Sequence, residues 1–98
     1  MVKSPPIITM DVSKQLLRQI MERQKDAMMR MSYIQLQDKA WAEIAVGNIF
    51  VVVYKRLSQY PGIESENAWI SRIAVEEWRH LGRRKALGLK PRILTQRR

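Results

Sequence analysis

No glycine or proline interrupts the chain between Asp11 and Val46, and apolar residues recur through this stretch at helical spacing. The steps are threes and fours, or their sum of seven, as one face of an α-helix requires. The recurring apolar positions are Leu16, Ile20, Ala27, Met31, Ile34, Trp41, Ala45, Ile49 and Val52. Two polar residues share this face. Arg23 can lay its apolar stem along it and keep its charge in water, whereas Asp38 favours a bend or break. One long helix and two shorter helices both fit the pattern.

Residues 40–54 are the most apolar stretch of the chain, flanked by Lys39 and by Lys55-Arg56. As a helix, fifteen residues span roughly 22 Å, which is short of the ~30 Å hydrocarbon core of a bilayer. Glu43 and Asn48 would add a further cost inside lipid. The stretch therefore predicts a buried core helix, and a membrane-embedded segment is the weaker alternative.

A strand is the second alternative for part of this stretch. Residues 49–54 are rich in β-formers and follow Gly47-Asn48, which is a turn signal. A single strand needs a partner, and no other segment offers a good one. Helix is therefore favoured unless a dimer supplies the second strand.

The clearest turn is Ser58-Gln59-Tyr60-Pro61-Gly62. Ser65 or Asn67 can cap a helix after it. This helix is expected to run over 65–87, because Gly88 and Pro91 form a stop signal beyond its basic last turn.

The formal net charge of +9 is concentrated at the carboxyl end. All nine acidic residues lie between Asp11 and Glu77. Ten basic residues lie at or before position 77. The other basic residues come after Glu77 with no acid among them. Such asymmetry is typical of contact with a polyanion, because each neutralised phosphate releases a counterion. A solubilising tail, an arm that docks on an acidic protein, and an amphipathic helix on an anionic membrane surface are the alternatives.

On a helical projection the predicted helix over 65–87 separates into two faces. Ile70, Ala74, Trp78 and Leu81 cluster on the apolar face, while Arg72, Arg79 and Arg83 share the opposite face with Glu76. Guanidinium groups in a row can bind successive phosphates with two hydrogen bonds each. The predicted nucleic-acid-binding residues are Arg72, Arg79, Arg83, Arg84, Lys85, Lys90, Arg92 and Trp69. Trp69 projects beside the basic face, where it can stack on an unpaired base or pack against the neighbouring helix.

No pattern typical of a catalytic, cofactor or metal site is found. The chain has no cysteine, which fits an intracellular setting, and its single histidine, His80, is expected at the surface. The four glycines match neither a phosphate-binding loop nor a dinucleotide fingerprint. We therefore expect no enzyme activity, no cofactor and no metal.

Taken together, the sequence predicts an all-α protein with an extended arm over 1–10, one helical domain over 11–88 and a basic tail over 89–98. Its predicted function is non-catalytic binding of DNA or RNA through phosphates, as an accessory or architectural protein. The alternative is a structural helical subunit of a larger complex, and membrane embedding through 40–54 is one form of this alternative. The apolar face of the long helix exceeds what two helices bury, so we also expect a homo-oligomer or a larger assembly.

Overall fold

The computed structural model describes residues 10–94, and their side chains from Val12 onward. Within this range the chain forms three α-helices, α1 (Met10–Leu36), α2 (Lys39–Lys55) and α3 (Glu66–Ala86), and two short 3-10 turns, η1 (Leu57–Gln59) and η2 (Ile63–Ser65). All regular structure in the described part is helical, which confirms the all-α class. The arm expected over 1–10 lies outside the described residues except for Met10, which already belongs to α1.

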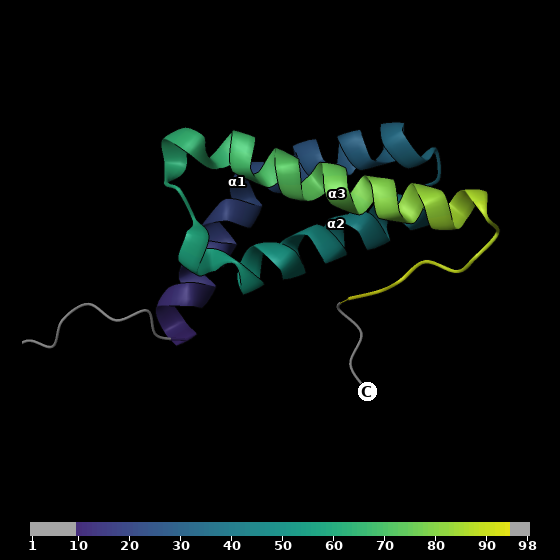
Figure 1. The fold of residues 1–98 in the computed structure, drawn as a ribbon. Helices are drawn as coiled ribbons and strands as arrows, with labels where there is room; N and C mark the ends of the chain where they lie inside the picture. Colours follow the sequence, from purple (N-terminus) through teal and green to yellow (C-terminus); the bar gives the residue numbers. More distant parts are fainter. Residues whose placement is uncertain (1–9, 95–98) are drawn as a thin grey trace, which may run out of the picture.

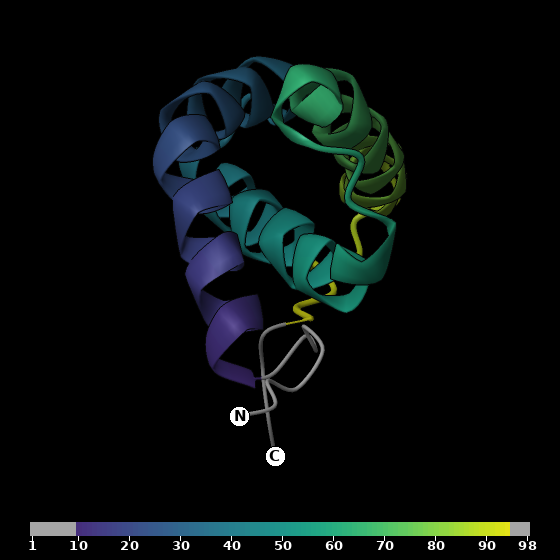
Figure 2. The ribbon, with the colours of Figure 1, turned by 90° about the vertical axis from the view of Figure 1, so that its left-hand side faces the viewer.

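The three helices run alternately in opposite directions (Figure 1). Viewed from the end of the molecule, α1 lies on the left, α3 on the right and α2 below and between them (Figure 2). α3 therefore packs against the helical hairpin that α1 and α2 form. This arrangement buries one side of each helix and leaves an outer face on each of them.

The long helical stretch is broken at Gln37 and Asp38, so the two-helix interpretation is correct. Gln37 has φ +58, a left-handed conformation that stops a helix, and its N–H donates to Tyr33 O at 2.7 Å. Asp38 is extended and its Oδ1 accepts a hydrogen bond from Trp41 N at 3.1 Å. This contact satisfies an N–H that the first turn of α2 would otherwise leave unpaired.

The apolar stretch over 40–54 lies entirely within α2, as a core helix. Ala42, Ala45, Ile49 and Val53 have no exposed surface. The strand alternative for residues 49–54 is wrong, because these residues continue the helix and pack inside the bundle. Among residues 10–94, no helix has the length and apolar character needed to cross a membrane.

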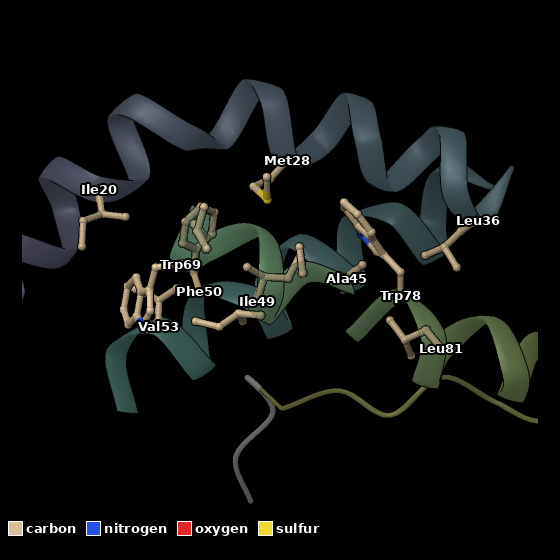
Figure 3. Packing of buried hydrophobic residues seen from close by; sticks show 13 residues of the cluster. Ile20, Met28, Leu36, Ala45, Ile49, Phe50, Val53, Trp69, Trp78 and Leu81 are labelled. Atoms are coloured by element: carbon tan, nitrogen blue, oxygen red, sulfur yellow. The ribbon is translucent and has the colours of Figure 1, made fainter. Parts of the chain in front are cut away.

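The core is built from side chains of all three helices (Figure 3). On α1 the buried apolar residues are Ile20, Met28 and Leu36, which are eight residues apart. The polar residues halfway between them, Gln24 and Ser32, are buried as well. The buried face of α1 therefore follows every fourth residue and includes polar positions.

The predicted apolar face of α1 is wrong in its second half, where Met31 and Ile34 are 42% and 62% exposed. The reason is that α3 supplies partners for the polar residues on the neighbouring face. Trp78 Nε1 donates to Ser32 Oγ at 2.8 Å, and Gln24 Nε2 donates to Glu66 Oε2 at 2.7 Å. Because these buried groups are hydrogen-bonded, their burial costs little.

Arg23 does not simply extend into water, as the sequence suggested, because it forms an ion pair with the buried Glu66 at the start of α3. Arg23 Nη2 lies 2.6 Å from Glu66 Oε1, and Tyr60 O–H donates to the same oxygen at 2.6 Å. Burial opposes ionisation of Glu66, but hydrogen bonds from Arg23, Gln24 and Tyr60 outweigh it and lower its pKa to about 2. The charged carboxylate thus joins α1 to the first turn of α3.

Candidate nucleic-acid interface

The interface proposed from sequence lies on α3 and the segment that follows it. The inner face of α3 carries Ile70, Ile73, Ala74 and Leu81, all buried in the bundle. Since an α-helix turns by about 100° per residue, positions opposite this face must point to solvent. Any contact with a polyanion through α3 must use that outer face.

Arg72, Arg79 and Arg83 are exposed on the outer face, and we call these three residues the arginine stripe. From Arg72 to Arg83 the helix rises roughly 16 Å. Between Arg72 and Arg79 the surface has a hollow of about 340 Å³, lined also by Ser71, Val75 and Glu76. Glu76 lowers the local charge but leaves the stripe net positive. The structure thus places three of the sequence-predicted residues on one face with open space between two of them.

Trp69 is not available to a ligand, which corrects its suggested role in base stacking. It is only 8% exposed. Its ring meets that of Tyr60 edge to face, with the ring centroids 5.5 Å apart. Tyr60 is in turn held by Glu66, so Trp69 belongs to the packing around the start of α3. The alternative of packing against neighbouring elements is therefore the right one.

Arg84 and Lys85 are only partly exposed, because the last turn of α3 shapes the chain reversal. Gly88 has φ +74, Gly88 N donates to Lys85 O at 3.0 Å, and Leu89 N donates to Arg84 O at 2.9 Å. This pair of bonds is the Schellman arrangement that ends many helices. Arg84 Nε also donates to Lys90 O at 2.7 Å. The Arg84 side chain is therefore engaged in holding the turn.

Beyond the turn, the segment over 89–94 runs back beneath α2 and α3 (Figure 1). The buried side chain of Asn48 holds it: Nδ2 donates to Arg92 O at 2.7 Å, and Oδ1 accepts from Leu94 N at 2.8 Å. Asn48 Nδ2 also donates to Glu77 Oε2 at 2.7 Å. Asn48 therefore binds the main chain of this segment at two points.

Lys90 and Arg92 have exposed side chains on this segment. The Arg92 side chain is 49% exposed, with Nη2 3.9 Å from Glu77 Oε1. At this length the ion pair leaves the guanidinium largely to solvent. Lys90 and Arg92 are therefore open to solvent, although the structure does not place them on the outer face of α3.

Sequence reasoning did not identify Asn48 and Glu77 as positioning residues. In the sequence, Asn48 stands out only as part of a turn signal and as a polar residue that would be costly in lipid, and Glu77 only as the last of the acidic residues. A signal was available, because an amide inside a buried helix needs hydrogen-bond partners. The sequence alone could not say that the partners are a carboxylate and the carboxyl-terminal main chain.

His80 is half-buried, in contrast to the expected surface position. Its Nε2 is enclosed and has no hydrogen-bond partner among the described residues. Within the described residues no group of three or more histidine, cysteine or acidic side chains is placed to hold a metal ion.

Comparisons of this chain with protein families, with curated proteins and with solved structures gave no match.

Proposed function

We propose that this protein binds nucleic acid without catalysis, through the phosphate backbone, as an accessory or architectural component. The observation that carries the proposal is the arginine stripe on the outer face of α3. A guanidinium group binds phosphate with two parallel hydrogen bonds, and three groups on one rigid helix lose little freedom on binding. Lys90 and Arg92 add exposed charge on the following segment.

The length of the stripe fits this role. One strand of a duplex carries a phosphate about every 3.4 Å along the axis, so ~16 Å of helix faces about five phosphates. With Trp69 buried, the described part of this surface offers arginine but no aromatic ring for base stacking. The proposed contacts are therefore with phosphates and independent of base sequence.

The test is a titration of a labelled duplex of about 20 base pairs, followed by fluorescence anisotropy at several salt concentrations. Single-stranded DNA and duplex RNA serve as comparison probes. We expect the logarithm of the association constant to fall linearly with the logarithm of salt concentration, with a slope of about −3 for the arginine stripe alone and up to about −5 if Lys90 and Arg92 also bind.

The decisive variant combines Arg72→Gln, Arg79→Gln and Arg83→Gln. It should weaken duplex binding by about 10-fold or more at about 100 mM salt and make the slope shallower by about 2 to 3. The matched control combines Lys14→Gln, Arg18→Gln and Lys25→Gln, which removes the same charge from exposed positions on α1. If both triple variants weaken binding equally, the chain acts only through its total charge and the proposal for α3 fails.

A further inference from the structure

An apolar hollow elsewhere in the described part of the protein is separate from the arginine stripe. It is an open groove of about 730 Å³ between α1 and α2. Its floor is apolar, formed by Leu17, Met21 and Met29 from α1 and by Val46, Phe50 and Val51 from α2. None of the described residues that line the groove belongs to α3. Figure 2 shows α1 and α2 side by side on the left and in the centre, with α3 on the right.

The edges of the groove carry more positive than negative charge. Lys25, Asp26 and Lys55 line it directly. A second hollow of about 410 Å³ shares Leu17, Met21 and Lys25 with the groove and is also lined by Lys14, Arg18 and Glu22. Together the two hollows present four cations and two acids along an apolar floor.

The shape of the groove fits a helix. Two neighbouring helices form its walls, and a further helix packs against such a pair at 8–10 Å from each axis. From Leu17 to Met29 the floor extends roughly 18 Å, which is the length of a helix of about 12 residues. Methionine side chains on the floor can adapt to the shape of a partner.

The charge along the edges decides the kind of occupant. A second copy of this chain would bring the same excess of cations against it, and each copy carries +9 overall. A helix with acidic residues along both edges would instead meet the lysines and Arg18 favourably. We propose that the groove between α1 and α2 binds an amphipathic helix of a partner protein, apolar on one face and acidic at its edges.

The probe is a synthetic peptide of about 18 residues with leucine and methionine on one helical face and glutamate along both edges. A second peptide keeps the apolar face and replaces the edge glutamates with lysine. We expect micromolar binding of the acidic peptide by anisotropy, and binding of the lysine peptide at least about 10-fold weaker. Equal binding of the two peptides would overturn the proposal.

Variants of the full chain locate the site. Val51→Glu places a charge on the groove floor and should reduce binding of the acidic peptide about 10-fold or more, with circular dichroism confirming that the variant folds. The α1 triple variant with glutamine at 14, 18 and 25 should reduce it comparably. The α3 triple variant with glutamine at 72, 79 and 83 should leave it unchanged. Because each triple variant is the control for the other, failure of the groove proposal is distinguishable from failure of nucleic-acid binding.

Two other occupants would contradict the proposal. If sedimentation shows a dimer that Val51→Glu converts to a monomer, the groove is an interface between copies. The amino-terminal segment carries the adjacent apolar residues Ile7 and Ile8. If Ile7→Asp combined with Ile8→Asp raises the affinity for the acidic peptide about 10-fold, the occupant is this segment of the chain itself.

Discussion

Two buried carboxylates on α3, Glu66 at its start and Glu77 eleven residues later, are held in different ways. Glu66 is contacted by Arg23 at 2.6 Å and by Gln24 and Tyr60 at 2.7 and 2.6 Å. Glu77 accepts a hydrogen bond from a neutral amide at 2.7 Å, and the nearest cation among the described residues, Arg92, is 3.9 Å away. The first carboxylate is neutralised directly and ties two helices together. The second is only loosely paired, and beside it Asn48 holds the carboxyl-terminal segment.

The fold therefore depends on the charge of Glu66 more than on the charge of Glu77. At the Glu66 end, loss of the negative charge should weaken the junction between α1 and α3. At the Glu77 end, the neutral amide of Asn48 should matter more than the Arg92 side chain. Three measurements, given below from the strongest to the weakest, test this difference between the two ends of α3.

The largest expected effect is on acid stability. The pKa of the Glu66 carboxyl is about 2 in the folded protein against an ordinary value of 4.5. Because the folded-state pKa is lowered, the stabilisation is fully present above about pH 4.5 and is lost as pH falls through about 2. The loss should amount to roughly 3 kcal/mol of the free energy of unfolding. Urea unfolding from pH 7 to pH 2 measures it. Glu66→Gln should show a pH dependence that is smaller by that amount, and an unchanged dependence would contradict the assignment.

At neutral pH, Glu66→Gln should lower the free energy of unfolding by about 2–3 kcal/mol. The neutral amide keeps some hydrogen bonds but leaves the Arg23 guanidinium without its counter-charge. Glu64→Gln is the matched control, since Glu64 is exposed two residues earlier and should change stability by less than about 0.5 kcal/mol. Urea unfolding at pH 7 distinguishes the two variants. A similar effect of both would remove the contrast between the two ends of α3.

At the other end, Asn48→Ala should cost about 1–2 kcal/mol, because it leaves Glu77 and two main-chain groups without their partner. Arg92→Ala should cost less than about 0.5 kcal/mol, as expected for a long, half-exposed ion pair. Hydrogen exchange at the Leu94 amide should accelerate in Asn48→Ala and hardly change in Arg92→Ala. If Arg92→Ala has the larger effect, the ion pair rather than the amide holds the segment.

The helical class and the core position of α2 could be predicted from sequence, because each depends on local spacing and on the length of an apolar run. The break at Asp38 could be predicted as well, because an acidic residue interrupts the apolar face of the helix there. The buried face of α1 could not be read in the same way. Burial of Gln24 and Ser32 depends on their hydrogen bonds with Glu66 and Trp78, which lie more than forty residues away in the sequence.

In the candidate site, too, some features follow from local helical geometry and others depend on contacts that are distant in sequence. Arg72, Arg79 and Arg83 were placed correctly on one face because helical geometry alone determines it. Trp69 was ambiguous because its position at the edge of that face fits either solvent or packing, and the contact with Tyr60 decides it. The hydrogen bond from Arg84 to the Lys90 carbonyl depends on the chain reversal at Gly88. The spacing of residues along the helix does not predict it.

The connection between α1 and α2 turns on Gln37, a residue with a side chain in a backbone conformation that usually selects glycine. Its amide Nε2 donates back to Ile34 O at 2.8 Å, which offsets part of the strain and fixes how the chain leaves α1. Glycine at this position would relieve the backbone strain. It would also allow the connection between α1 and α2 to adopt other conformations. The two walls of the α1–α2 groove are thus joined through a turn whose backbone depends on Gln37 and on the cap at Asp38.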